Sequence, residues 1–314
     1  MGSRVDYLRI SITDRCNFRC TYCMPPGGIP WKPHTDILSF EEIVRFTRAA
    51  VAAGISRVRI TGGEPLVRRQ CVSLVKQLAA VPGIEDLSLT TNGSLLDGFA
   101  RDLKRAGLGR INVSIASLDP ARFFRLSGGA GLEPVLAGLA SALDAGFSPV
   151  KVNVVALDGI ENDLGEFVSL SRRRPVHIRF IEHMPIGRFD GGGWGFIPRE
   201  RLLGELRAFG DLAPAPSPGG GGPAQYFQYA GAAGTIGFIS SMSDHICGGC
   251  NRMRLTADGY LRGCLFSGDE LNVRPFIGGD RQRLTAIILD AIDAKKFNRG
   301  GASPGPRTMS QIGG

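Results

Sequence analysis

The residues of this chain with the clearest chemical potential are three cysteines near its start, Cys16, Cys20 and Cys23, with Tyr22 just before the last. Three soft thiolates from one short loop can hold a metal centre that keeps one coordination position free. A disulfide framework is a poor alternative, because a 314-residue chain with seven cysteines is too large and too poor in cysteine to depend on disulfide bonds for stability. A structural zinc site completed by a distant ligand stays open, although Cys-x3-Cys-x2-Cys is not zinc-knuckle spacing.

A second group of three cysteines lies far along the chain and consists of Cys247, Cys250 and Cys264. His245 could complete a four-ligand zinc site, whereas an iron–sulfur cluster held by three cysteines would leave an iron open to substrate. The spacing alone favours neither metal. Arg252 and Arg254 favour a binding function, because alternate residues of a strand point the same way and guanidinium groups match phosphate oxygens.

The elements that must position these residues follow a repeating pattern of short β-branched runs and helical segments. The expected strands are 7–12, 57–61, 86–91, 110–115, 150–155 and 176–181. The expected helices are 40–53, 71–80, 95–106, 133–145 and 163–172. Six βα-like units in series predict an α/β fold with a parallel sheet, open or curled into a partial barrel.

Within these strands, apolar and polar residues alternate. Arg9, Arg59 and Lys151 fall on the polar face of their strands, opposite residues such as Ile10 and Ile60. A sheet with both faces covered would carry continuous apolar runs instead. The pattern predicts a hydrophilic cavity lined by strand interiors and suited to a polyanionic substrate. A one-sided sheet exposed to water is the alternative.

The composition changes after about residue 184, where turn-rich stretches begin. Segments 190–195, 214–218 and 219–222 are predicted as loops around a short helix at 199–209, and Asp258-Gly259 as a hairpin turn. We expect two domains, 1–184 and 185–314. Cys71 is expected to be a buried helix cysteine outside both groups.

The charge of the chain is +8 and its pI about 9.4, which suggests an anionic partner such as nucleic acid, a membrane surface or a phosphorylated small molecule. No apolar run approaches the roughly 20 residues that span a bilayer. We found neither a signal peptide nor a myristoylation pattern. The chain is expected to be cytoplasmic, in a reducing compartment that preserves thiolates for metal, with no membrane partner.

The loop after the second expected strand, Thr61-Gly62-Gly63-Glu64-Pro65, lets the backbone approach a ligand closely and adds a carboxylate. Together with the first cysteine loop, it resembles the radical S-adenosylmethionine (SAM) superfamily. Within that superfamily the chain resembles the GTP 3′,8-cyclase family over nearly its whole length. The matching motifs are 14–25, 59–65, 247–266 and 309–314.

The resemblance implies two [4Fe-4S] clusters, SAM as cofactor and GTP as substrate. The first cluster falls on Cys16, Cys20 and Cys23, and the second on Cys247, Cys250 and Cys264. The residues implied near SAM are Tyr22, Gly63, Glu64, Ser114 and Met184. Those implied near GTP are Arg9, Arg59, Thr90, Lys151, Arg179, Arg252, Arg254, Gly313 and Gly314. The family commonly has an aspartate where this chain has Ala116.

The resemblance also implies the fold, an incomplete (βα)6 barrel like that of triosephosphate isomerase, closed by a C-terminal extension that carries the second cluster. In the implied reaction SAM is cleaved reductively, and the 5′-deoxyadenosyl radical removes the 3′ hydrogen of GTP, whose C3′ then attacks C8 of guanine. The product is 3′,8-cyclo-7,8-dihydroguanosine 5′-triphosphate, in the first step of molybdenum cofactor biosynthesis. Implied partners are a reducing electron donor and a downstream cyclic pyranopterin monophosphate synthase.

Two other functions stay open on the sequence. A different radical SAM enzyme with an auxiliary cluster, for example a peptide-modifying one, would share the first motif and a C-terminal cysteine group. A zinc-knuckle nucleic-acid binder would suit the charge but gives no reason for residues 61–65. The oligomeric state is not settled by the sequence, and a homodimer is one expected form.

Overall fold

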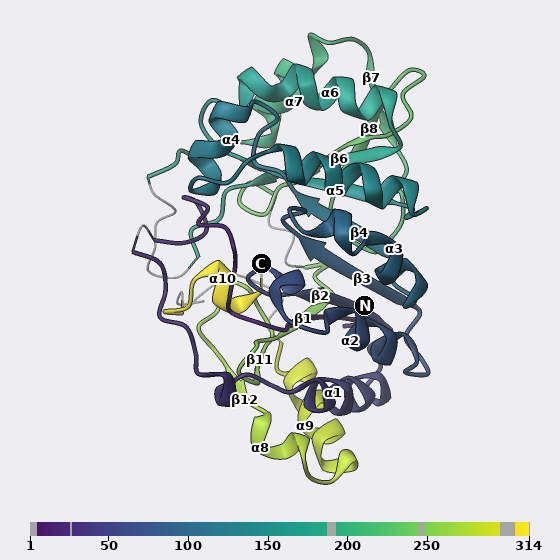
Figure 1. Ribbon diagram of the computed structural model, residues 1–314, viewed down its shortest axis with the longest axis vertical. Helices are drawn as coiled ribbons and strands as arrows, with labels where there is room; N and C mark the ends of the chain where they lie inside the picture. Colours follow the sequence, from purple (N-terminus) through teal and green to yellow (C-terminus); the bar gives the residue numbers. More distant parts are fainter. Residues whose placement is uncertain (1–4, 26, 187–192, 245–247, 296–304, 314) are drawn as a thin grey trace.

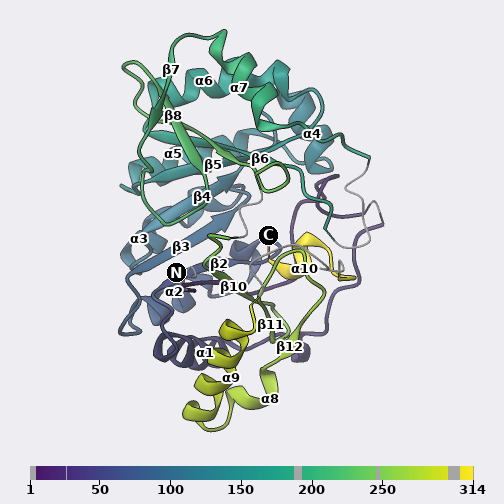
Figure 2. The same ribbon diagram turned by 180° about the vertical axis from the view of Figure 1, so that it is seen from behind.

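The computed structural model of the chain describes residues 5–25, 27–186, 193–244, 248–295 and 305–313. At its centre lies one sheet of 12 strands (Figures 1 and 2). The strands are β1 (Tyr7–Ser11), β2 (Arg57–Thr61), β3 (Asp86–Thr91), β4 (Arg110–Ser114), β5 (Val150–Ala156), β6 (Val176–Glu182), β7 (Leu212–Ala215), β8 (Gln225–Tyr229), β9 (Ile236–Ile239), β10 (Arg252–Leu255), β11 (Tyr260–Arg262) and β12 (Leu271–Asn272).

The order across the sheet is β12-β11-β10-β1-β2-β3-β4-β5-β6-β9-β8-β7. β1 to β6 are parallel neighbours in chain order, and β10 and β9 add to the two sides of this set, also in parallel. The remaining pairs are antiparallel. Segments from the second half of the chain therefore flank both sides of the six-stranded unit.

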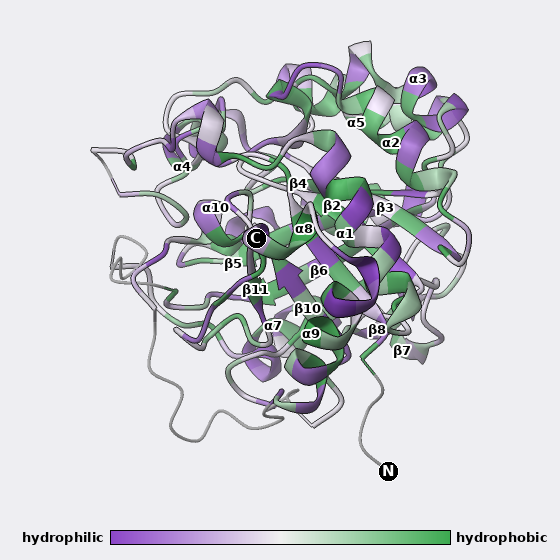
Figure 3. Ribbon diagram, turned by 90° about the horizontal axis from the view of Figure 1, so that it is seen from below, coloured by the Kyte–Doolittle hydropathy of each residue, from purple (hydrophilic) through white to green (hydrophobic). Residues whose placement is uncertain are grey.

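The helices are α1 (Phe40–Ala52), α2 (Cys71–Ala79), α3 (Ala100–Arg105), α4 (Pro120–Ser127), α5 (Glu133–Asp144), α6 (Leu164–Arg173), α7 (Arg199–Arg207), α8 (Arg274–Ile277), α9 (Arg281–Asp293) and α10 (Met309–Ile312). Figure 1 shows α9 beside α1, and α10 close to the centre of the molecule. Viewed from below in Figure 3, α1 and α2 carry both hydrophilic and hydrophobic residues, as helices with one buried face do. Among the described helices none has the length and apolar character to cross a membrane.

The local sequence explains why α1 begins where it does. The Ser39 hydroxyl accepts a hydrogen bond from the Glu42 amide at 3.1 Å, and the Glu42 carboxylate accepts one from the Ser39 amide at 2.7 Å. This reciprocal capping satisfies amides that have no partner within the helix. One turn on, Ile43 and Phe46 are fully buried against the sheet, so burial of the apolar face fixes the helix in place.

The parallel arrangement confirms the expected α/β fold. The observed strands β2 and β3 have the expected bounds, and the others differ by one residue. The prediction of one helix over 95–106 is wrong: a 3-10 turn at Leu96–Gly98 and α3 are separated at Phe99. Barrel closure stays a prediction, because in the described part β12 and β7 end the sheet without pairing to each other.

The polar faces of the parallel strands are not open to water. Arg59 is 7% exposed and Lys151 only 2%. Desolvating two cations is costly unless the interior offers polar partners or an anion. The alternative of a one-sided sheet exposed to solvent is therefore wrong, and the interior of the curved sheet is a buried polar space.

Candidate active site

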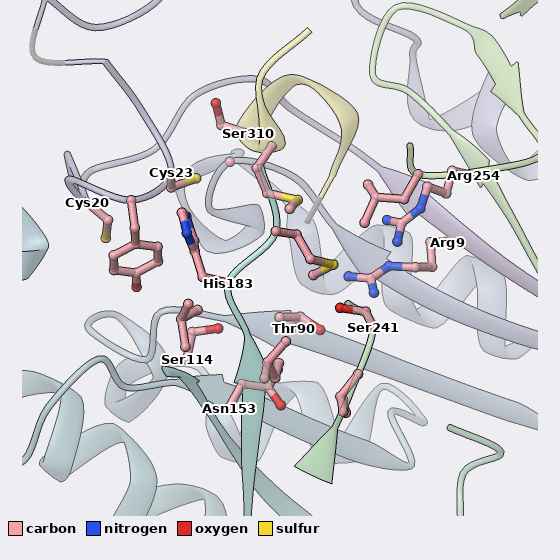
Figure 4. Close-up of a pocket in the computed structure, with 18 of the residues that line it drawn as sticks. Arg9, Cys20, Cys23, Thr90, Ser114, Asn153, His183, Ser241, Arg254 and Ser310 are labelled. Carbon is pink, nitrogen blue, oxygen red and sulfur yellow. The ribbon is translucent and has the colours of Figure 1, made fainter. Parts of the chain in front are cut away.

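The carboxyl ends of the parallel strands open onto a cavity of about 300 Å³. Cysteines from both groups line it, namely Cys16, Cys20, Cys23, Cys250 and Cys264. Figure 4 shows Cys20 and Cys23 on one side of the cavity, and Arg9 and Arg254 on the opposite side. The structure thus brings together two cysteine groups that are more than 200 residues apart in the sequence.

The first cysteine loop is shaped by its own backbone and by the end of α4. The amides of Cys23 and Met24 donate to the Cys20 carbonyl at 3.0 and 3.1 Å, and the amide of Thr21 donates to Leu126 at 2.9 Å. A Cβ at Gly128 would overlap the Arg19 carbonyl, so only glycine allows α4 to end this close to the loop. These contacts hold the three thiols facing one cavity.

The donor set fits a cluster that needs a free coordination position. Cys16, Cys20 and Cys23 are free thiols, and the cavity rather than a fourth cysteine lies beyond them in the described part of the chain. Burial raises the pKa of Cys20 to about 12, so a thiolate there needs a compensating positive charge. A metal cluster supplies that charge.

Gly63 lies at the closest approach of the β2 loop to the first cysteine loop. Its amide donates to the Thr13 carbonyl at 2.7 Å, and a Cβ there would overlap the Arg15 carbonyl. Gly63 lines the cavity, as do the other predicted SAM-site residues Tyr22, Ser114 and Met184. Their contact with SAM itself stays a prediction.

Glu64 differs from the other predicted SAM-site residues, because it is 1% exposed and absent from the cavity wall. Its carboxylate accepts hydrogen bonds from the Leu66 amide at 3.0 Å, the Thr91 hydroxyl at 2.8 Å and the Asn92 amide at 2.6 Å. Burial raises the pKa of Glu64 to about 7 although these donors oppose the shift. The side chain joins the loop after β2 to the loop after β3.

In the second cysteine group, Cys250 and Cys264 line the cavity, whereas Cys247 and His245 lie outside the described residues. Lys295, two residues beyond α9, lies with its Nζ atom 3.6 Å from the Cys250 sulfur and donates to the Arg252 carbonyl at 2.9 Å and to the Gly263 carbonyl. Burial opposes ionisation of Cys250, but the charges of Arg252 and Lys295 outweigh it and lower its pKa. A thiolate ligand is thereby favoured.

The predicted pair of guanidinium groups, Arg252 and Arg254, lies on β10, and Arg9 of the neighbouring strand β1 lies beside it. Arg9 on β1 is the register partner of Arg254 on β10, and both line the cavity together with Arg252. Burial and the neighbouring Arg252 lower the pKa of Arg254 to about 9. Within the described residues the Arg9 Nε, Thr90 Oγ1 and Ser241 Oγ atoms are buried without a hydrogen-bond partner. Such orphaned donors beside clustered positive charge are suited to an anionic ligand.

Three further predicted GTP-site residues, Arg59, Lys151 and Arg179, are not part of the cavity wall and lie deeper between the strands. Arg59 donates to the Ser88 hydroxyl at 3.2 Å. Arg179 donates to Asn112 at 2.7 Å and to Asn153, which does line the cavity. The basic interior is therefore continuous with the cavity.

The end of the chain also reaches the site. Met309 and Ser310 of α10 line the cavity, and the Gly313 carbonyl accepts a hydrogen bond from Arg254 at 2.9 Å. Gly313 has φ +85°, and a Cβ would lie 2.6 Å from the Thr61 hydroxyl oxygen and 2.8 Å from the Ser11 Cβ. Gly314 lies outside the described residues.

The packing around Ala116 explains why an alanine fits at this position. It is 4% exposed in a small apolar cluster with Leu126 and Leu157, against which Tyr22 packs. An ionised side chain at this position would have to lose its water in apolar surroundings. The departure from the family pattern is thus accommodated by apolar contacts behind the cysteine loop. Cys71 is buried in α2, as expected.

Several cavity residues were not singled out from the sequence. Ser241, Glu182 and Phe266 line the cavity, and Glu182 accepts hydrogen bonds from the Met242 amide at 2.7 Å and the Ser243 amide at 3.0 Å. Ser241 follows β9, whose pairing with β6 no local pattern reveals. Glu182 at the end of β6 could have been found, since polar residues at the carboxyl ends of parallel strands commonly line sites.

Comparisons with known proteins cover both halves of the chain. Residues 10–170 match the family described as Radical SAM superfamily, and residues 176–300 the one described as Molybdenum Cofactor Synthesis C. A protein of Moorella thermoacetica named GTP 3′,8-cyclase is 46% identical over 99% of this chain and 98% of its own length. One from Petrotoga mobilis with the same name is 42% identical over 100% of this chain and 98% of its own.

Among solved structures, SuiB of Streptococcus suis bound to precursor peptide SuiA matches with a TM-score of 0.65. The match covers 90% of this chain and 67% of that chain at 14% identity. Methylornithine synthase (PylB) matches with a TM-score of 0.51 over 65% of this chain and 62% of that chain, at 18% identity. These likenesses show the fold alone.

Proposed function

This chain belongs to the GTP 3′,8-cyclase family of radical SAM enzymes, and on that premise we propose how its residues hold the cofactors and GTP. The enzyme converts GTP to 3′,8-cyclo-7,8-dihydroguanosine 5′-triphosphate in the first step of molybdenum cofactor biosynthesis, with SAM and two [4Fe-4S] clusters. The observation that carries the proposal is the single cavity lined by both cysteine groups and by Arg9, Arg252 and Arg254.

The proposed cluster ligands are Cys16, Cys20 and Cys23 on one side, and Cys250 and Cys264 with Cys247 on the other. When bound, the first cluster with SAM supplies a radical that removes the 3′ hydrogen of GTP, and the second supplies an iron for the guanine. Tyr22, Gly63, Ser114 and Met184 are proposed to contact SAM, because they line the cavity beside the first cysteine loop. Glu64 is proposed to support this site through Asn92.

The triphosphate is proposed to bind the basic residues of β1, β2, β5, β6 and β10. Arg9, Arg252 and Arg254 supply guanidinium donors from the cavity wall, and Arg59, Lys151 and Arg179 supply the charge behind it. Thr90 and the Gly313-Gly314 tail complete the set. Fixing phosphates at several points holds the ribose in one orientation and so reduces the entropy lost on reaching the transition state.

Apolar side chains have a separate task. Phe18, Val155, Ile181, Ile239 and Leu265 line the same cavity and make part of its wall apolar. Excluding water and other hydrogen donors protects a radical from quenching before it reacts with the base. We propose that these apolar residues have this protective task in the parts of the cavity wall that the polar residues do not form.

The enzyme test uses anaerobically reconstituted protein with SAM, GTP and a strong reductant. Mass spectrometry should detect 5′-deoxyadenosine and the cyclised nucleotide. Cys16→Ala should abolish both, and absence of both products in wild type with intact clusters would refute the proposal. Metal analysis gives an independent readout, since two zinc ions and no iron would exclude cluster binding.

The triphosphate site is tested by Arg252→Ala. This change should weaken GTP binding by roughly 1.5 to 3 kcal/mol, the scale of one charged hydrogen bond. Arg101→Ala on the exposed side of α3 is the matched control and should bind GTP normally. Unchanged GTP affinity in Arg252→Ala would contradict a phosphate role for that strand.

The broader setting is also proposed. We propose two domains, a partial barrel over 1–184 and a cluster-binding part over 185–314. The proposed partners are a reducing electron donor and a downstream cyclic pyranopterin monophosphate synthase. A cytoplasmic location suits this activity. A homodimer remains a proposal to be tested by light scattering. The zinc-knuckle nucleic-acid-binding alternative is set aside by the family assignment.

A further inference from the structure

Four consecutive glycines, Gly219–Gly222, lie against the basic interior near the amino ends of the parallel strands β2 and β4. They belong to the connection between β7 and β8, which the sequence predicts only as a flexible loop. The Gly219 carbonyl accepts a hydrogen bond from the Nζ atom of Lys151. A Cβ at Gly220 would overlap the guanidinium of Arg110, and a Cβ at Gly221 would overlap that of Arg57. We call this segment the tetraglycine loop.

The loop needs glycine for two reasons. Gly219, Gly220 and Gly221 have φ of +97°, +88° and +56°, a region that other residues rarely adopt. The neighbouring arginines also cannot move aside freely. Arg110 Nε donates to the Asp86 carboxylate at 2.8 Å, its Nη2 pairs with the other carboxylate oxygen, and Arg57 lies 3.5 Å from the Asp6 carboxylate.

The arginines beneath the tetraglycine loop have hydrogen-bond donors without a partner among the described residues. Arg110 is 8% exposed and its Nη1 atom has no hydrogen-bond partner within the described residues; the same holds for Nε of Arg179, which is 3% exposed. Nor do the amides of Gly220, Gly221 and Gly222 donate to any described group. Guanidinium and backbone N–H donors gathered in this way suit an anion such as phosphate.

This group is continuous with the active-site cavity. Arg179 donates to Asn153 in the cavity wall and to Asn112, and Asn112 is the register partner of Lys151. Lys151 in turn contacts the tetraglycine loop. Phosphates extending inward from the cavity would therefore meet Arg179 and Lys151 first and the tetraglycine loop last.

We propose that the tetraglycine loop is the specificity-determining floor of the triphosphate site, which contacts the outermost phosphate and so distinguishes GTP from GDP and GMP. The proposal rests on the proposed GTP site. Without nucleotide, the Lys151 Nζ atom donates to the Gly219 carbonyl. A terminal phosphate would replace this contact and would also accept hydrogen bonds from the glycine amides and Arg110. A diphosphate or monophosphate ends short of these donors.

The test measures binding of GTP, GDP and GMP to the reconstituted holoenzyme by anaerobic calorimetry. Gly220→Ala places a methyl group where the Arg110 guanidinium lies and should weaken GTP binding roughly tenfold, which is about 1.4 kcal/mol. Its affinity for GDP and GMP should change less than twofold. The control is Gly231→Ala, whose φ is also positive at +71° but whose Cβ would meet no atom within 4 Å, and whose affinities should stay unchanged.

Unchanged GTP affinity in Gly220→Ala, or an equal loss for all three nucleotides, would overturn the proposal. If Gly220→Ala does not fold, Gly221→Ala provides the same test through Arg57. Failure of the wild type to bind GTP would refute the proposed function instead. In that case, binding of inorganic triphosphate tests the role of the tetraglycine loop separately. Binding to wild type that is tenfold weaker in Gly220→Ala supports the proposal. Equal binding to both proteins, or no binding to either, rejects it.

Discussion

At the scale of single residues, Lys151 couples nucleotide binding to pH. Burial and the charges of Arg179 and Arg110 lower its pKa to about 6, so at pH 7.5 most of the free protein carries a neutral lysine. A bound triphosphate favours the charged form and raises this pKa. GTP binding should therefore take up a proton, and GTP affinity should fall as the pH rises above about 6.

Calorimetry in two buffers of different ionisation enthalpy measures this uptake. Since GTP also titrates, the lysine is isolated by comparison with Lys151→Met, which should take up less. Lys76→Met, on the exposed side of α2, should match the wild type. Identical uptake in wild type and Lys151→Met would show that Lys151 is already charged in the free enzyme.

Glu64 makes stability depend on pH in the opposite sense from an ordinary paired carboxylate. Its pKa is raised to about 7 by burial, so the folded protein holds a proton that the unfolded chain releases near pH 4.5. Its contribution to stability is complete below about pH 4.5 and is lost as the pH rises through about 7. The thermal midpoint of wild type should fall between pH 5.5 and 8.

Glu64→Gln cannot ionise and should flatten this pH dependence, although it is less stable at every pH because it loses an acceptor for the Asn92 amide. Glu166→Gln on exposed α6 should keep the wild-type profile. A Glu64→Gln profile parallel to that of wild type would assign the pH dependence to another group.

At the scale of elements, α10 lines one side of the cavity, and Gly313 directly after it contacts Arg254. Gly313→Ala introduces a methyl group against Thr61 and Ser11 in a backbone conformation that favours glycine. The Gly313 carbonyl should then lose its bond to Arg254, and GTP binding should weaken several-fold, by about 1 kcal/mol, which is the net contribution of a typical hydrogen bond. Calorimetry with Gly231→Ala as control checks this. Equal affinities would show that the tail position does not affect the nucleotide.

The elements also show what the sequence can predict. Alternation placed Arg9 and Lys151 on buried polar faces, because the strand period depends only on neighbouring residues. The helix predicted over 95–106 is broken at Phe99, which has a non-helical φ of −121° and packs against the core. Tertiary packing can override local helical preference. The sequence predicts only a flexible connection at the tetraglycine loop, because the contact of Gly220 with Arg110 joins residues 110 apart in the chain. Such long-range contacts leave no local pattern.

At the scale of the whole molecule, the two halves of the chain share one sheet. β10 and β9 pair with β1 and β6, and the Thr285 hydroxyl of α9 lies 3.5 Å from the Ala49 carbonyl of α1. A 1–184 fragment would expose both sides of the parallel unit and should aggregate, as seen by size-exclusion chromatography. Co-expression with 185–314 should restore a soluble complex. A monomeric 1–184 fragment with a cooperative unfolding transition would show that it is an independent domain.

The ends of the sheet have a consequence for handling the enzyme at high concentration. Any open sheet offers unpaired edge groups to which a strand of another chain can add, the first step of fibrous aggregation. Here one end is β7, four residues long with Pro214 among them, and the other is β12, with only two residues. Proline lacks an N–H donor, and two residues make a poor template. The protein can thus keep its sheet open around a substrate without recruiting its own copies edge to edge.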